Sequence, residues 1–132
     1  MVIWWRPPLQ AGSFEEELGS AEAGWRPDLD IFESDDEFLL AFDLPGVTSE
    51  DVEVILQGRT LAVAGVRRAQ VPPEAIAHLV ERPRGSFERR VRLPASADLS
   101  RLRTELRDGQ LLVVVGKRRS AGVEVRIAVE RG

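Results

Sequence analysis

The residue types that carry most enzymatic chemistry are scarce in this sequence. Its 132 residues include a single histidine, His78, and no cysteine. A thiolate nucleophile and a cysteine-type zinc site are therefore excluded, and one histidine among scattered carboxylates has no metal-ligand spacing. There is also no G-x-S-x-G motif for a serine nucleophile and no G-x-x-x-x-G-K-[ST] loop for ATP. We expect no enzyme: no catalytic residues, no metal and no cofactor.

Basic residues offer a second kind of chemistry, the binding of nucleic-acid phosphates. They surround Phe87 and recur after Gly116: Arg82, Arg84, Arg89, Arg90, Arg92, Lys117, Arg118 and Arg119. Basic residues beside an aromatic ring can resemble an RNA-binding surface. However, Phe87 is in phase with Val91 and Leu93 and is expected to be buried, and the net charge is −4. We therefore expect a solvated basic face and no nucleic-acid partner.

Length and composition are those of one globular domain with short appendages. Hydrophobic residues make up 43% of the chain and charged residues 30%, and a chain of this size can bury a core without disulfides. No apolar run approaches the roughly 18 residues that span a membrane, and the start MVIWWRPP does not resemble a signal peptide. The expectation is a cytoplasmic protein with no membrane partner.

Charge is distributed unevenly along the chain. Residues 1–66 contain 3 basic and 14 acidic residues, whereas residues 67–132 contain 15 basic and 8 acidic residues. Opposed charges of this kind can attract each other within one fold or between two copies. Alternatively, interleaved strands average the charges out. The sequence leaves both open.

Short alternating or apolar runs separated by turn residues predict β-strands from Trp25 onward. The runs are DIFES, EFLLAFDLPG, DVEVILQG, TLAVAGVRR, SFERRVRLP, RTELR and QLLVVVGK. Their predicted buried faces include Phe38, Leu40, Phe42, Leu61, Val63, Phe87, Val91 and Leu93. Several short strands without helical periods between them indicate an antiparallel sandwich or barrel.

Turn residues refine this prediction. Gly58 fits a tight turn and Gly65 a β-bulge. Leu99, Leu102 and Leu106 have helical spacing, but Asp108-Gly109 predicts a hairpin, which favours a turn followed by the strand RTELR. Because QLLVVVGK is apolar on both faces, we expect it in the middle of the sandwich.

The first 24 residues read as an arm with aromatic contact points. Ser13 and Glu16 have the spacing of a capping box, which predicts a short helix over FEEEL. The aromatic residues Trp4, Trp5 and Phe14 are candidates for binding other proteins; alternatively, the two tryptophans fold back onto the domain. At the other end, Val123, Val125, Ile127 and Val129 alternate like a strand that docks on its own core or on another copy.

Six motifs occur in a fixed order between Trp25 and Val129: W-R-P-x-x-D-I-x-E, F-D-L-P-G-V, G-x-T-L-x-V-x-G, E-R-x-x-G-x-F-x-R-x-V-x-L-P, D-G-x-L-x-V and I-x-V. In this combination the chain resembles a small heat shock protein of the Hsp20/alpha-crystallin family, of bacterial type. The resemblance implies an all-β fold, an immunoglobulin-like antiparallel β-sandwich called the alpha-crystallin domain, at residues 25–117. A flexible N-terminal arm (1–24) and a C-terminal extension (118–132) would flank it.

The resemblance also implies a dimer. The segment His78, Leu79, Val80 and Glu81 would be a strand on a long loop that pairs with the sheet of a partner subunit. Arg89 occupies the position of the family's dimer-interface arginine and is expected to pair with an acidic group; the alternative is a solvated arginine.

The same resemblance gives the terminal motif a role. Ile127 and Val129 would insert into a groove between DVEVIL and RTELR, with Val54, Leu56, Leu102 and Leu106 as candidate lining residues. Two such side chains contribute roughly 3 to 6 kcal/mol of burial before the cost of ordering the tail. The docking is therefore expected to be weak and reversible, within or between subunits.

The function implied is that of an ATP-independent holdase, which binds partly unfolded client proteins and prevents their aggregation. Expected partners are such clients and further copies of the chain, as a dimer or a larger oligomer. The alternative is a co-chaperone or assembly adaptor with the same sandwich fold.

Overall fold

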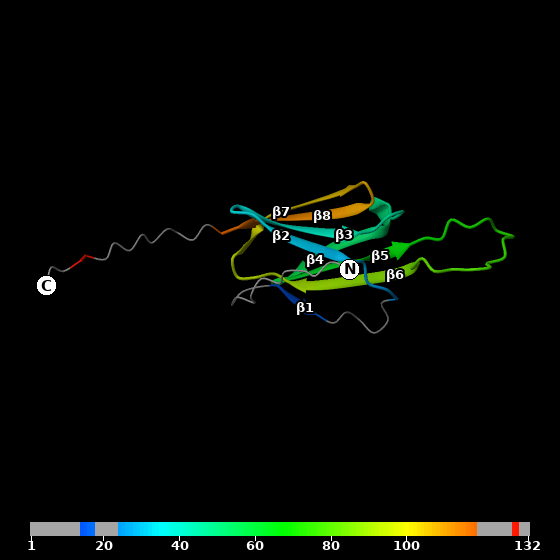
Figure 1. Cartoon of the computed structure of the whole chain (residues 1–132), viewed down its shortest axis with the longest axis horizontal. Helices are drawn as coiled ribbons and strands as arrows, with labels where there is room; N and C mark the ends of the chain where they lie inside the picture. The colour runs from blue at the N-terminus through cyan, green and yellow to red at the C-terminus, as the bar shows by residue number, and fades with distance from the viewer. Residues whose placement is uncertain (1–13, 18–23, 119–127, 130–132) are drawn as a thin grey trace.

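The computed structural model describes residues 14–17, 24–118 and 128–129. These residues form two four-stranded antiparallel sheets packed face to face (Figure 1). In the part described, the only helical element is a single 3₁₀ turn, Ser49–Asp51. The all-β sandwich expected from the sequence is confirmed.

The first sheet has the strand order β1-β6-β5-β4. Its strands are β1 (Glu15–Glu17), β6 (Gly85–Arg92), β5 (Thr60–Arg67) and β4 (Val52–Gln57). Gly85 and Thr60 therefore begin the two central strands, and β1 and β4 are the edges.

The second sheet has the strand order β2-β3-β8-β7. Its strands are β2 (Leu29–Glu33), β3 (Glu37–Asp43), β8 (Gln110–Lys117) and β7 (Ala97–Arg107). The run QLLVVVGK thus lies between two neighbours in its sheet, as its two apolar faces predicted.

The core lies between the sheets and is made by the alternating residues of β3, β5, β6 and β8. Fully or almost fully buried are Phe38, Leu40, Phe42, Leu44, Leu61, Val63, Phe87, Val91, Leu93, Val113 and Val115. No polar or charged residue is buried among the described residues. Because every second residue of a strand faces the core, the alternation in the sequence correctly identified the members in β3, β5 and β6 and Leu93, whereas Leu44, Val113 and Val115 were not among the predicted residues.

Gly58 and Gly65 occupy positions that require glycine for different reasons. Gly58 has φ +61° in the β4–β5 turn, as predicted, and Asp108 and Gly109 have φ of 52° and 75°, which is the geometry of a two-residue hairpin. Gly65, in contrast, does not form the predicted bulge: it pairs in regular register with Val52. A Cβ there would overlap the carbonyl oxygen of Asp51, so the requirement is close approach of backbone.

The prediction of a helix over FEEEL is wrong. Residues Glu15–Glu17 form β1, which pairs antiparallel with Arg92, Val91 and Arg90 of β6. A capping box is a local signal, and here a long-range ladder and opposite charges on β6 outweigh it.

Strand β7 is longer than the predicted RTELR. It starts at Ala97, and its pairing with β8 is interrupted by an irregularity between Asp98 and Leu102. The irregular register explains why leucines in this segment have a spacing that resembles a helix.

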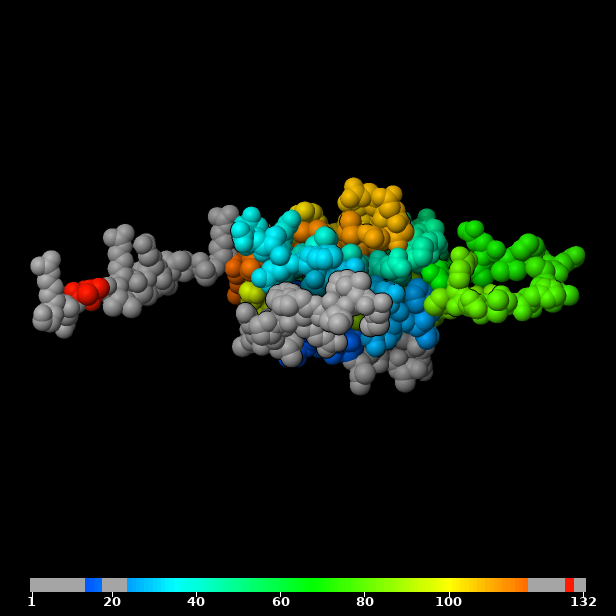
Figure 2. All heavy atoms as spheres, in the orientation of Figure 1, coloured from blue at the N-terminus to red at the C-terminus, as the bar shows by residue number. Residues whose placement is uncertain are grey.

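A long loop, residues 68–84, joins β5 to β6 and projects from one end of the sandwich (Figures 1 and 2). It contains no strand in the single chain. Its apolar residues are exposed: Val71, Ile76, Leu79 and Val80.

Candidate docking sites at the sheet edges

The two edge strands β4 and β7 lie on the same side of the sandwich. On the opposite side, the chain passes from β1 to Trp25, which hydrogen-bonds to Ser86 and Glu88 along the outer edge of β6, and then enters β2. The other edge strands, β4 and β7, both place partly buried apolar residues against the same core cluster.

The four candidate groove residues are brought together here. Val54 of β4 and Leu102 and Leu106 of β7 are half-buried and pack against the same core cluster. Leu56 is 39% exposed and its neighbour Ile55 is 43% exposed. We name this apolar strip between β4 and β7 the edge groove. Its residues are partly exposed in the single chain.

Val129 of the tail motif does not occupy the edge groove of its own chain. Val129 is 91% exposed, and Ile127 lies outside the described residues. A Val129 seated between β4 and β7 would be mostly buried. Docking of Ile127 and Val129 into the groove of another subunit therefore stays a prediction.

The proposed dimer segment lies at the far limb of the long loop. Leu79 is 77% exposed and Val80 is 50% exposed, and His78 and Glu81 beside them are exposed as well. An extended segment needs a neighbouring ladder to become a strand, and the single chain offers none at this position.

Arginines hold the base of this loop in place. Arg67 donates to the carbonyl oxygen of Pro83, and its guanidinium lies 4.7 Å from the centre of the Trp25 ring. Arg68 Nε and Nη2 donate to the two carboxylate oxygens of Asp51 at 3.0 and 3.2 Å. This hydrogen-bonded pair lowers the pKa of Asp51 and raises that of Arg68. The two limbs of the loop and the Pro45–Gly46 turn enclose a hollow of about 560 Å³.

Strand β2 is a second edge with exposed apolar side chains. Its outer residues Ile31 and Phe32 are 36% and 58% exposed. Strand β2 pairs only with β3 among the described residues, so its other side presents unpaired backbone groups.

Arg89 pairs with an acidic group, and that group belongs to its own chain. Its Nη2 lies 2.8 Å from Oε1 of Glu16 in β1, and its Nη1 donates to the carbonyl oxygen of Pro27 at 2.9 Å. Burial, followed by repulsion from Arg26, lowers the pKa of Arg89. A fully solvated arginine is therefore not what the single chain contains.

The aromatic candidates of the arm divide into two groups. Trp4 and Trp5 lie outside the described residues. Phe14 is half-buried, and its ring meets that of Phe38 edge-on with 5.1 Å between centres. In this state Phe14 contacts the core and not a client.

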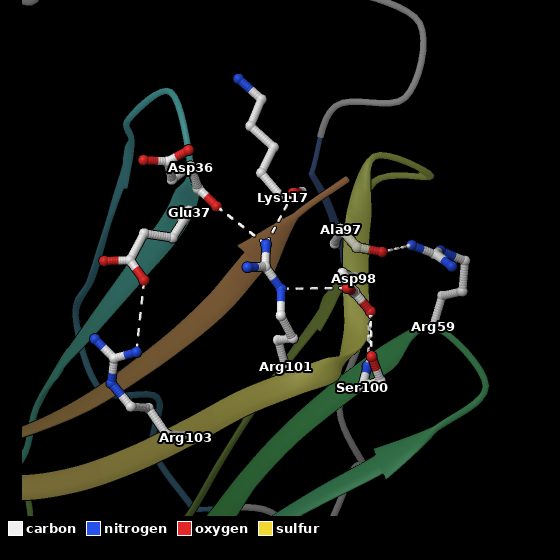
Figure 3. A network of polar contacts seen from close by, with 9 residues as sticks. All are labelled: Asp36, Glu37, Arg59, Ala97, Asp98, Ser100, Arg101, Arg103 and Lys117. Carbon is white, nitrogen blue, oxygen red and sulfur yellow. Dashed lines mark hydrogen bonds and ion pairs between the residues drawn. The ribbon is translucent and has the colours of Figure 1, made fainter. Parts of the chain in front are cut away.

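One polar cluster was missed by the sequence reasoning, at the point where the tail leaves β8 (Figure 3). Arg101 donates to the carbonyl oxygen of Lys117 at 3.0 Å and lies 3.2 Å from Oδ2 of Asp98. Lys117 Nζ donates to Glu33 Oε2 at 2.8 Å. We name Arg101, Asp98, Lys117 and Glu33 the tail-root network. Gly116 gives room for it, since a Cβ there would lie 2.6 Å from Arg101 Nη2.

The tail-root network ties the last strand to two other parts of the fold. The backbone N–H of Lys117 donates to Asp36 and that of Arg118 to Ser96. Because these partners come from the β2–β3 turn and the β6–β7 connection, the end of β8 is fixed to both of these segments. The sequence signal, a lone glycine before a basic run, was not sufficient to reveal these contacts.

No group of three or more histidine, aspartate or glutamate residues that could hold a metal ion occurs within the described ranges. None of the described elements is a helix of the length and apolarity needed to cross a membrane.

Comparison with known proteins agrees with the fold. The sequence profile described as Hsp20/alpha crystallin family matches residues 30–130. Among solved structures, a small heat-shock protein from Xylella fastidiosa is 34% identical with a TM-score of 0.69, over 83% of this chain and 100% of that one. The hspA protein of Xanthomonas axonopodis is 36% identical with a TM-score of 0.65, over 73% and 97% of the two chains.

Similar curated proteins include longer ones. A 19.0 kDa class II heat shock protein from Oryza sativa is 40% identical over 68% of this chain and 59% of its own length. Spore protein SP21 of Stigmatella aurantiaca is 33% identical over 70% of this chain and 55% of its own length. The match thus spans less than two thirds of either relative. The profile covers well over half of this sequence, and the chain therefore belongs to the Hsp20/alpha crystallin family.

Proposed function

We propose that this protein is an ATP-independent holdase, which binds partly unfolded proteins and keeps them from aggregating. Small heat shock proteins are non-enzymatic chaperones, and family membership is the coarse basis for the proposal. The observation that supports the proposal most directly is the location of the exposed apolar surface. Large apolar side chains are exposed at the sheet edges and on the long loop, at Ile31, Phe32, Ile55, Leu56, Val71, Ile76, Leu79 and Val80.

This distribution suits adaptable binding. The core is fully packed and closed to solvent. The exposed apolar groups at the sheet edges, in contrast, lie beside unpaired strands, which can form backbone hydrogen bonds with an extended chain. An unfolded client offers both apolar side chains and free backbone groups. We propose that Trp4, Trp5 and Phe14 add aromatic contacts when the arm is released.

The same surfaces support self-association. We propose that His78–Glu81 of one subunit pairs with the free edge of β2 in another, and that Ile127 and Val129 dock in a partner's edge groove. Both contacts cover exposed apolar groups, and the tail contact is weak enough to open. A cytoplasmic location completes the proposal.

The direct test is light scattering of a heat-labile client protein with graded amounts of the full chain and no nucleotide. We expect suppression of aggregation at near-stoichiometric ratios. A matched sample with bovine serum albumin controls for nonspecific protein effects. Absence of suppression at every temperature would contradict the holdase proposal and favour a co-chaperone or adaptor that binds one specific partner.

A further inference from the structure

Strand β1 is complementary in charge to the strand that it covers. Its residues Glu15–Glu17 are three consecutive glutamates, and their register partners on β6 are Arg92, Val91 and Arg90. The edge of β6 presents arginines, and the strand that covers it consists only of glutamates. Opposite charges across a strand pair stabilise the pairing.

The central glutamate of β1 meets two arginines. Glu16 Oε1 contacts the guanidinium of Arg26 and lies 2.8 Å from Nη2 of Arg89. The Arg89 side chain is only 19% exposed, and its buried Nε has no hydrogen-bond partner among the described residues. Removal of Glu16 would leave a half-buried cation without a carboxylate in contact with it.

An aromatic side chain completes the contact. Phe14 directly precedes β1 and packs edge-on against Phe38, a core residue of the opposite sheet. Phe14 and Glu16 are two residues apart and so lie on the same face of an extended chain. That face thus carries one aromatic ring, which contacts Phe38, and one carboxylate, which contacts Arg89.

Strand β1 is nevertheless held by few interactions. It has three residues and, in the described part, pairs on one side only. Glu15 and Glu16 are exposed, and Glu17 accepts one hydrogen bond, from Thr60 Oγ1 at 2.8 Å. Short edge strands held by exposed charges open at low free-energy cost, and salt weakens them further.

We propose that the β6 edge beneath β1 is a docking site for an extended client segment, and that β1 closes this site until it detaches. The segment recognised has an aromatic residue followed two positions later by a carboxylate, the pattern of Phe14 and Glu16. Its backbone pairs with residues 90–92, its aromatic ring contacts Phe38, and its carboxylate contacts Arg89. This inference rests on the proposed holdase function and specifies one of its client sites.

The charge of the edge decides which occupant fits. Arg89, Arg90 and Arg92 lie on the edge strand itself and Arg26 lies beside it. A basic or purely apolar strand would leave Arg89 unpaired, so an acidic, aromatic-containing segment is favoured. A second copy of the chain brings its own β1 but gives up an identical contact to do so, which leaves no net gain.

The test compares wild type with three full-length variants and uses one labelled probe and one control peptide. The probe is the fluorescein-labelled peptide GSFEEELG, the sequence of residues 12–19, and binding is followed by fluorescence anisotropy. The opened protein carries Phe14→Ala with Glu16→Gln, with Glu16→Gln alone as a milder variant. The closed protein carries Glu15→Cys with Arg92→Cys, a directly opposed pair; the chain has no other cysteine, so oxidation can bridge only these two positions.

We expect the opened protein to bind the peptide at least about tenfold more tightly than wild type, because the tethered β1 no longer competes at high effective concentration. The oxidised closed protein should not bind it, and reduction should restore binding. A peptide with serine for Phe14 and lysine for Glu16, GSSEKELG, should bind none of them. Non-reducing electrophoresis checks that the disulfide of the closed protein forms within one chain. Thermal unfolding checks that each variant is folded.

Equal binding to wild type, the opened protein and the oxidised closed protein, or no binding to the opened one, would overturn the docking site. Light scattering of the heat-labile client, run in parallel, separates this result from the wider proposal. If wild type suppresses aggregation but the peptide does not distinguish the variants, the β6 site is wrong and the holdase function stands. If the peptide distinguishes them but wild type suppresses nothing, the site stands as a peptide-binding edge and the holdase function is wrong.

Discussion

Position 65 requires glycine because neighbouring parts of the fold pack closely against it. A Cβ at this position would overlap the backbone oxygen of Asp51 and lie 2.8 Å from the ring of Phe87. Both neighbours are fixed, one by the backbone and the other by the core. The glycine therefore allows β5 to pass close to the chain that enters β4.

Gly65→Ala should destabilise the domain by about 2–4 kcal/mol, because backbone and core must both shift to accept the methyl group. Thermal or urea unfolding measures the loss. Gly116→Ala is the matched control: its methyl group meets the guanidinium of Arg101, which can swing aside, so the cost should be smaller. An equal loss for both variants would contradict the argument from close approach.

Asp98 illustrates a second effect at the residue scale, a shifted ionisation. Its pKa is lowered first by the hydrogen bond from the Ser100 hydroxyl, then by the Ser100 backbone N–H and by Arg101. Since the folded-state pKa lies below the unfolded value of 3.8, the stabilisation is present above that value. It is lost as the pH falls through the folded-state pKa.

Ser100→Ala should raise the pKa of Asp98 toward its ordinary value, because the largest single cause of the shift is removed. Carboxyl ¹³C chemical shifts recorded across acidic pH give the value directly. Arg101→Ala, which removes a smaller cause, should raise it less. A larger effect of Arg101→Ala would show that charge and not hydrogen bonding controls this carboxylate.

At the scale of elements, the sequence predicted the strands of the core better than the segments at the edges. In runs such as EFLLAFD, the alternation of apolar residues itself shows which side chains are buried. Strand β3 and its neighbours could therefore be predicted from local sequence. The strand Glu15–Glu17 could not, since its stability comes from Arg89, Arg90 and Arg92, more than seventy positions later in the chain. The contact of Lys117 with Glu33 at the tail root, 84 positions apart in the chain, is hidden from the sequence in the same way.

The long loop carries an element-scale prediction about dimerisation. Leu79→Asp should weaken the proposed dimer by roughly 1–3 kcal/mol, because a charge would replace an apolar side chain that is expected to be covered by a partner. Sedimentation velocity over a range of concentrations measures the change. Ile76→Asp, in the same loop and 81% exposed but outside residues 78–81, is the control and should have little effect. Equal weakening by both would place the interface elsewhere on the loop.

At the scale of the whole molecule, the sandwich is a closed unit from which the long loop projects (Figure 1), and we propose that β1 detaches from it. The resemblance in the sequence correctly gave the family and the sandwich, because its motifs lie in the strands and their turns. Contacts between subunits are a different matter. A single chain shows which surfaces are open, such as the edge groove and the β2 edge, but their occupants depend on a second chain.

The tail provides the prediction for the assembled molecule. Ile127→Ala together with Val129→Ala should shift the protein from larger assemblies toward dimers, because the edge groove would lose both apolar side chains proposed to fill it. Native mass spectrometry measures the shift. The sandwich should still unfold cooperatively at an unchanged temperature, since Val129 is exposed in the single chain and contributes nothing to its core.

The matched control for this prediction is Val123→Ala together with Val125→Ala, which changes the same alternating tail outside the I-x-V motif. It should leave the assembly state as it is in wild type. If both double variants dissociate the assemblies equally, the tail acts through general hydrophobicity and not through two specific positions in the groove. If neither does, the groove between β4 and β7 is free to bind clients at all times, and the arm and loop must account for any assembly beyond the monomer.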